Sequence, residues 1–274
     1  MKVALIGAIF ILAVTQGIHF TEHKVNGATA GETFVDPGAV RLAKAACVGD
    51  SKGITRQISS GVSPDSRTTK DGKNDVSVLL WALSCTNLTG AEALLNAGAN
   101  PNLAVGRFRI TPVYVAAAYR DSNFLRLLLE HRGNPNARTN DGEPALMQAY
   151  LVGQNYGQWQ NFYALLDAGA DVNYGSVASY AASVGHPSKT VDLLNRGYNN
   201  DLNELARSMY SSGIADNPMS PEYKYLTIAA RILKARGVDT EEIKREIDAY
   251  NKKVGAGIVQ NYNFETAHVG EAPN

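Results

Sequence analysis

The side chains that most often carry chemistry are few in this sequence and lie far apart. It holds two cysteines and five histidines, His19, His23, His131, His186 and His268. A catalytic histidine needs a partner within hydrogen-bond reach, and a zinc site needs three or four clustered ligands. None of the motifs H-E-x-x-H, C-x-x-C, G-x-G-x-x-G and G-x-S-x-G occurs, nor does a Walker phosphate loop. We therefore expect no catalytic site, no cofactor and no metal, and we predict that the chain is not an enzyme.

The charge balance argues against nucleic acid as the partner. The 26 lysines and arginines match the 26 aspartates and glutamates. Without an excess of positive charge there is no general attraction to a phosphate backbone. Nucleic-acid binding is therefore not expected.

The first residues resemble an export signal. Lys2 precedes an uncharged apolar run from Val3 to Val14, which is shorter than the roughly 20 residues that a membrane-spanning helix needs. We predict a signal peptide over 1–17 and a periplasmic or secreted protein without stable membrane insertion after cleavage. An uncleaved anchor or a buried N-terminal helix is the alternative.

Helix endings of one kind recur along the chain and indicate how the rest is organised. Each combines a leucine pair, a glycine and an Asn or Asp. The Leu pair is typical of a buried helix face, the Gly of a helix stop, and the Asn or Asp of a turn. The copies are Leu94–Asn102, Leu128–Asn136, Leu165–Asn173 and Leu193–Asn200, with weaker copies at Ile58–Asp65 and Ile232–Asp239.

A second recurring element begins a helix upstream of each ending. Thr111-Pro112 has the form of an N-cap followed by a first-turn proline, and Ser77 stands at the same place one repeat earlier. An alanine recurs in each helix, where a small side chain allows close helix packing. These alanines stand at 45, 82, 116, 149 and 181.

Together the two elements resemble the ankyrin repeat, a turn and two helices in about 33 residues with a T-P-L-H-x-A signature. Ala181-Ala182-Ser183-Val184-Gly185-His186 closely matches the A-A-x-x-G-H of that family. The resemblance implies an all-α ankyrin-repeat solenoid with about five repeats and a divergent sixth over 38–239. An N-terminal linker over 18–37 precedes it in this reading.

Two irregularities and a closing helix complete the expected organisation. The fourth copy carries four extra residues, near Asn155–Gln158, and the sixth is interrupted by a loop over 211–218. After Asp239, apolar residues at Ile243, Ile247, Tyr250 and Val254 predict an amphipathic capping helix over 240–254. Residues 255–274 are expected to form a flexible tail.

The resemblance implies a concave binding face made of finger turns and of the variable residues in A-A-x-x-G. The finger positions are Lys73, Asn74 and Val76, then Arg107, Phe108 and Ile110, then Asn140, Asp141 and Glu143. We expect Phe108, Tyr119, Leu151 and Val152 to form a central exposed apolar strip that contacts a partner. The alternative is that these side chains pack against the finger loops or against each other.

The insertion adds aromatic residues to the candidates. Tyr156 and Trp159 lie on or beside it, and aromatic residues often anchor interfaces. They can instead simply fill the bulge that the insertion makes. The predicted partner-binding residues are Arg107, Phe108, Ile110, Tyr119, Leu151, Val152, Tyr156 and Trp159.

Cys47 and Cys85 fall in the variable helix columns of adjacent repeats. Neighbouring repeats stack about 10 Å apart, whereas a disulfide needs Cα atoms within about 7 Å. The one-residue offset between the two columns can close or widen this gap. The spacing argues against a bond without excluding it.

These features favour a binding protein. The leading hypothesis is a protein-binding module of the cell envelope that acts through its concave face. Exported ankyrin proteins of similar build serve bacteria as immunity proteins, which neutralise periplasmic effectors, and by this analogy the partner is an effector encoded nearby. The alternative is a scaffold or accessory factor for an envelope or stress-response enzyme.

Overall fold

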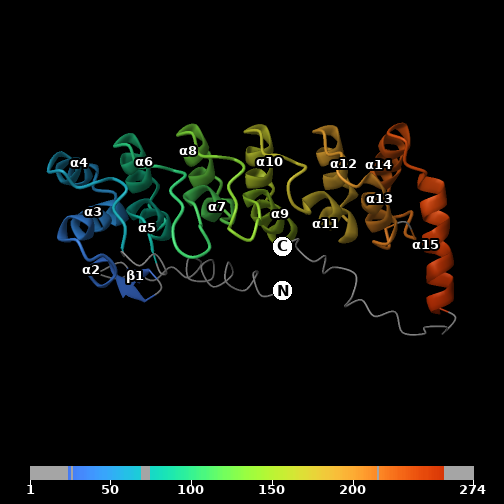
Figure 1. The fold of residues 1–274 in the computed structure, drawn as a ribbon, viewed down its shortest axis with the longest axis horizontal. Helices are drawn as coiled ribbons and strands as arrows, with labels where there is room; N and C mark the ends of the chain where they lie inside the picture. Colours follow the sequence, from blue (N-terminus) through green and yellow to red (C-terminus); the bar gives the residue numbers. More distant parts are fainter. Residues whose placement is uncertain (1–23, 26, 69–74, 215, 256–274) are drawn as a thin grey trace, which may run out of the picture. The chain divides into compact units, whose positions relative to one another are not determined.

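The structure is a computed structural model that describes residues 24–25, 27–68, 75–214 and 216–255 (Figure 1). The predicted signal peptide over 1–17, finger residues Lys73 and Asn74 and the predicted tail beyond Gly255 lie outside these residues. The chain divides into two compact units, Met1–Val177 and Ala178–Asn274. Within the described ranges, no helix has the length and apolar character needed to cross a membrane.

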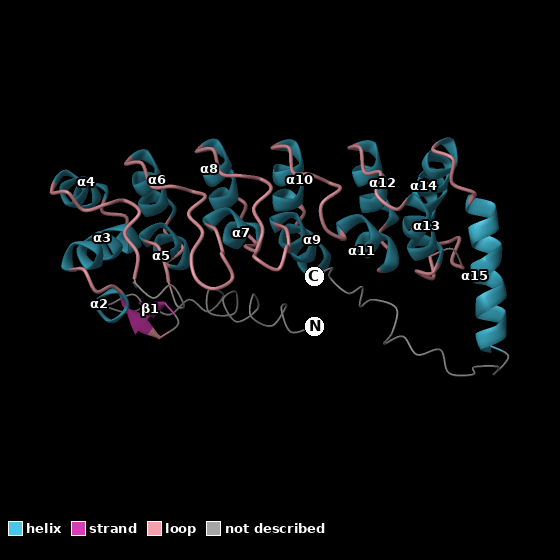
Figure 2. Cartoon of the chain, in the orientation of Figure 1, coloured by secondary structure: helices cyan, strands magenta, loops and turns pink. Residues whose placement is uncertain are grey.

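The first unit is a row of helix pairs (Figure 2). Its elements are β1 (Lys24–Val25), β2 (Ala28–Thr29), α2 (Ala30–Thr33), α3 (Pro37–Val48), α4 (Ser51–Ser59), α5 (Val78–Ser84), α6 (Leu88–Asn96), α7 (Pro112–Ala117), α8 (Asn123–Glu130), α9 (Ala145–Tyr156) and α10 (Gln160–Asp167). The first helices of successive pairs, α3, α5, α7 and α9, pack against one another in order. The second helices, α4, α6, α8 and α10, do the same. This arrangement matches the expected all-α repeat solenoid.

Helix starts and packing follow the recurring elements of the sequence. The Ser77 and Thr111 hydroxyls accept the amides of Leu80 and Tyr114, both at 3.2 Å, which confirms the two predicted N-caps. The recurring alanines at 82, 116, 149 and 181 are fully buried. In the first unit, the small side chains of Ala82, Ala116 and Ala149 allow the first helices of neighbouring repeats to approach closely.

Three non-glycine residues, Thr86, Arg120 and Arg132, occupy the glycine columns, and Thr86 and Arg132 keep the left-handed backbone expected there while Arg120 does not. Thr86 has φ 53° and Arg132 has φ 66°. Such angles are uncommon for residues with a Cβ, so the surrounding turn must enforce them. The repeat geometry is therefore stronger than the local preference of these residues.

Asparagines at the repeat endings bind each repeat to the next. The Asn102 side-chain oxygen accepts the Asn134 amide at 2.6 Å. One repeat later, the Asn136 oxygen accepts the Asp171 amide, also at 2.6 Å. Asp65 does the same for the Asn100 amide at 2.7 Å. We call this set of contacts the asparagine ladder, and it fixes the spacing of successive turns.

Part of the segment predicted as a linker is folded. Within 18–37, strands β1 and β2 pair antiparallel, and α2 begins with a capping box between Thr29 and Glu32. Phe34 is buried and its ring packs edge-on against Trp81 at 5.6 Å. The described part of this segment therefore covers the first repeats, because it supplies an apolar side chain to their core.

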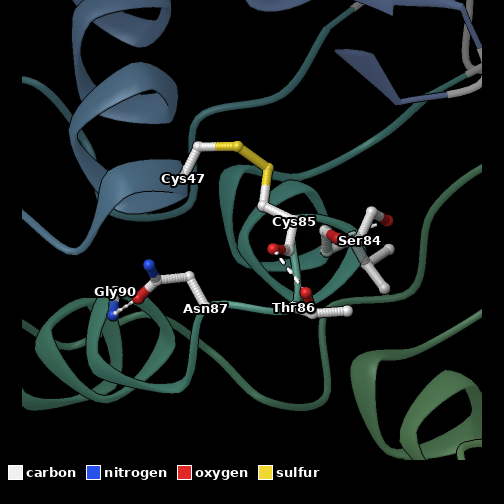
Figure 3. Close-up of a disulfide and its surroundings, with 7 residues drawn as sticks. Cys47, Ser84, Cys85, Thr86, Asn87 and Gly90 are labelled. Atoms are coloured by element: carbon white, nitrogen blue, oxygen red, sulfur yellow. Dashed lines mark hydrogen bonds between the residues drawn. A yellow bond between two sulfur atoms is a disulfide. The ribbon is translucent and has the colours of Figure 1, made fainter. Parts of the chain in front are cut away.

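A disulfide joins Cys47 and Cys85, which corrects the expectation drawn from helix spacing (Figure 3). Their Cα atoms lie 5.3 Å apart. Cys85 is the C-cap residue just beyond α5, so it lies in the turn rather than on the helix body. The offset between the two columns thus closes the gap between α3 and the end of α5.

The second unit continues with helices α11 (Val177–Ser183), which starts at the boundary, α12 (Pro187–Asn195), α13 (Leu202–Tyr210), α14 (Tyr223–Ala235) and α15 (Thr240–Gly255). Helix α12 packs on α14, and α13 packs on α15. Residues 211–222 join α13 to α14, where the sequence predicts an interrupting loop. Asp239 caps α15 by accepting the Glu242 amide at 2.9 Å, and Ile243 is buried.

Candidate functional site

The second finger turn presents an arginine and an aromatic ring at its tip. Val105 and Ile110 exchange both backbone hydrogen bonds at 3.0 Å, which closes a four-residue turn between them. At the tip, the Arg107 guanidinium lies 4.5 Å from the centre of the Phe108 ring. Arg107 is exposed, and Phe108 and Ile110 are half-buried. Three of the predicted binding residues therefore lie together on one finger and are accessible.

The third finger is tied to the second and carries a partly buried carboxyl group. The Asn140 amide donates to the Phe108 carbonyl at 3.0 Å. The Gln148 side-chain amide donates to the Glu143 carboxyl at 2.7 Å. Burial raises the pKa of Glu143; the bond from Gln148 lowers it, and the charge of Asp141 raises it further. The hydrogen bond between Asn140 and Phe108 holds the two fingers in a fixed relative position.

The expected apolar strip is only partly exposed. Tyr119 is 7% exposed and Val152 is 6% exposed, whereas Leu151 is half-buried. Neighbouring residues on a helix point about 100° apart, and on α9 this turns Val152 further into the protein than Leu151. The Tyr119 ring packs edge-on against Phe124 of α8 at 5.7 Å. The alternative in which these side chains pack within the protein is therefore correct for Tyr119 and Val152.

The turn around Tyr119 is covered by an asparagine of the next repeat. The Asn161 side chain, on α10, donates to the carbonyls of Ala116 at 3.2 Å and Tyr119 at 2.7 Å. It supplies a donor to the Tyr119 carbonyl and a second donor to the Ala116 carbonyl, which already accepts the Tyr119 amide at 3.1 Å. The Asn161 oxygen itself is buried without a hydrogen bond. This contact draws α10 over the turn and closes it to solvent.

The insertion lengthens α9 and places its two aromatic residues differently. Helix α9 runs on to Tyr156 and ends at Gly157, whose φ of 70° suits a C-cap. The Tyr156 side chain is exposed (49%), and the Arg120 guanidinium lies 3.7 Å from its ring centre. The insertion therefore creates an exposed, arginine-stacked tyrosine.

Trp159 turns inward instead. Its ring packs edge-on against Tyr150 at 5.4 Å and Phe162 at 5.8 Å. Gly153 leaves the space that the indole occupies, because a Cβ there would collide with it. Trp159 thus fills the bulge that the insertion makes. This was the alternative interpretation for Tyr156 and Trp159, and it holds for Trp159.

Arg120 and Asn161 were not among the predicted site residues. Arg120 stands where the A-A-x-x-G pattern has glycine. A charged residue at this position is the sequence signal that could have identified Arg120 as a candidate. Asn161 lies in a helix, and its partners are 42 to 45 residues away, so no local pattern points to it. In the described part of the chain, no three His, Cys, Asp or Glu residues form a group that could hold a metal ion.

Comparisons with known proteins agree on the repeat. Residues 79–176 match the family of ankyrin repeats in three copies. An ankyrin repeat domain from Acinetobacter baumannii AYE superposes with a TM-score of 0.55 at 22% identity, covering 69% of this chain and 96% of that one. This likeness shows the fold, so the predicted all-α ankyrin-repeat solenoid is confirmed.

A curated relative is also similar over part of the chain. Protein PhlB of Serratia liquefaciens is 31% identical over 131 residues, which are 47% of this chain and 53% of that protein. The match thus spans about half the length of the relative. Ankyrin repeats in general mediate protein–protein interaction.

Proposed function

We propose that this chain, built on an ankyrin-repeat fold, is a non-catalytic module of the cell envelope that binds a protein partner. The observation that carries the proposal is the exposed Tyr156 ring stacked by Arg120 at 3.7 Å. Tyrosine and arginine are the residue types that most often dominate binding energy at interfaces. A ring already held in place also loses little conformational entropy when a partner covers it.

The second finger supplies further contacts in this proposal. Arg107 stacks on Phe108 at its tip, and Leu151 of α9 is partly accessible. The binding surface consists of Arg107, Phe108, Ile110, Leu151 and Tyr156, with Arg120 added. Tyr119, Val152 and Trp159 support it from inside.

A periplasmic or secreted location belongs to the proposal. The Cys47–Cys85 disulfide supports it, because disulfides persist in oxidising compartments and are rare in the cytosol. The predicted signal peptide over 1–17 would direct the chain there. In the finer form of the proposal, the chain is an immunity protein whose partner is an effector encoded nearby.

Co-purification of the full chain with the product of the adjacent gene tests the partner and the surface together. Replacing Phe108 and Tyr156 with alanine should weaken binding about tenfold or more, because truncating anchor residues costs about 2 kcal/mol or more. Tyr250→Ala is the matched control, since this tyrosine of α15 is 51% exposed and outside the surface. Equal binding by the double variant would overturn the proposed surface.

Deletion of the gene separates the two roles. Sibling cells should poison a deletion strain if the chain is an immunity protein. A stress defect in monoculture, with full resistance to siblings, would overturn the immunity role in favour of an accessory factor.

A further inference from the structure

A polar cleft of about 590 Å³ lies beside the second and third fingers and is lined by residues other than those of the proposed binding surface. Its walls include Arg109 of the second finger and Arg138 at the base of the third. Asn102, Asn134 and Asn136 of the asparagine ladder also line it, and we call these three residues its floor. Phe108, Leu151 and Tyr156 are not among its lining residues, so the cleft is a separate feature.

The floor of the cleft is rigid because hydrogen bonds hold it. The Asn102 and Asn136 side-chain oxygens accept backbone amides of the following repeat, both at 2.6 Å. The Asn134 side chain accepts the Asn136 amide at 2.9 Å. The side-chain oxygens of these three asparagines are therefore engaged within the floor.

The two arginines are held at their backbones and exposed at their side chains. Arg109 adopts φ 53°, and its amide donates to the Gly106 carbonyl at 3.1 Å, which fixes the direction of its side chain. Arg138 pairs with Pro144 across the third finger, and its guanidinium lies 4.7 Å from the Tyr174 ring. Both side chains reach the cleft from ordered backbone.

The charge of the cleft is positive. Asp171 also lines it, but one of its carboxylate oxygens accepts the Asn173 amide at 2.9 Å within its own turn. Two guanidinium groups thus face one carboxylate. A guanidinium presents paired N–H donors that match the two oxygens of a carboxylate.

We infer that this cleft binds an extended acidic segment of a partner protein, with Arg109 and Arg138 each holding one carboxylate. In a polyproline-type segment, residues three apart lie about 9 Å apart on the same side. Acidic residues at every third position of such a segment therefore present successive carboxylates on one side, where the two arginines of the cleft can bind them. The inference does not depend on the proposed function, because it concerns other residues.

Fluorescence anisotropy of the full chain with labelled peptides tests the inference. The probe is a fluorescein-labelled peptide with Glu at every third position in a Pro- and Ser-rich background, and the control peptide carries Gln instead. The Glu peptide should bind, and its affinity should fall as salt is added, because the contacts are exposed ion pairs. Arg109→Gln combined with Arg138→Gln should weaken it about tenfold or more.

Arg126→Gln is the matched variant, since Arg126 is exposed on α8 and does not line the cleft. It should bind the Glu peptide like the parent chain, and circular dichroism should show the same fold for all variants. Equal binding of the Gln peptide, or equal loss with Arg126→Gln, would overturn the inference. Tighter binding of a single-stranded oligonucleotide through the same arginines would also overturn it. None of these results would affect binding at Phe108 and Tyr156.

Discussion

Asparagine side chains connect neighbouring repeats in two ways. In the asparagine ladder, an exposed Asn at the end of one repeat accepts an amide from the turn of the next. Asn161 instead works in the interior, where it donates to carbonyls at the end of α7. A buried carbonyl without a donor costs about 1–3 kcal/mol, so the interior contact carries the larger energetic weight.

Asn161→Ala should therefore destabilise the chain by about 1–3 kcal/mol, because it leaves the Tyr119 carbonyl without this donor, whereas the Ala116 carbonyl keeps the Tyr119 amide. Urea unfolding followed by circular dichroism measures the change. Asn123→Ala on α8 is the control, and as an exposed position it should stay within about 0.5 kcal/mol of the parent. A destabilisation by Asn161→Ala as small as that of the control would contradict the role of Asn161 as a buried hydrogen-bond donor.

Helices of adjacent repeats approach most closely where a side chain is missing. At Gly90, near the start of α6, a Cβ would collide with the carbonyl group of Ala46 in α3. The two helices pack directly on each other, so neither can move without disturbing the first repeat. This glycine is needed for packing, since its backbone is helical.

Gly90→Ala should consequently lower stability by about 1–3 kcal/mol through overpacking, even though alanine is the better helix former. Thermal unfolding measures the effect. Gly31→Ala in α2 provides a matched comparison, because the nearest atom to its added Cβ would be 3.9 Å away. A stabilised Gly90→Ala variant would show that α3 and α6 can separate freely.

At the scale of the whole molecule, helix contacts within each of the two units run mainly between neighbouring repeats. Stability in such a stack is a sum of local terms, so a local change has a local effect. The disulfide lies in the first unit, near its N-terminal end, and joins the first two repeats. The contribution of the disulfide to stability should therefore be greatest in the first two repeats.

Replacing Cys47 and Cys85 with serine should lower stability by about 2–4 kcal/mol, as expected for a cross-link over 38 residues. Hydrogen exchange of the full chain should become faster in α3 to α6 and stay unchanged in α12 to α14. Reduction of the parent chain should reproduce this pattern. Uniformly faster exchange would contradict local coupling and indicate one cooperative unit.

The sequence by itself determined the repeat register, the helix starts at Ser77 and Thr111, the helix after Asp239 and the site of the insertion. These features depend on residues close together in the chain, through capping, turn chemistry and helical spacing. The left-handed backbone at Thr86 and Arg132 shows that the turn geometry persists at these two positions without glycine, whereas Arg120 departs from it.

Only the tertiary structure decided which candidate residues are accessible and that the two cysteines meet. Tyr119 is buried because Phe124 and Asn161 cover its turn, and Tyr156 stays exposed because α9 extends over Arg120. Cys47 and Cys85 meet because a turn in one repeat reaches a helix in another. Each outcome depends on side chains from separate repeats, whose distances are set by packing rather than by spacing along the chain.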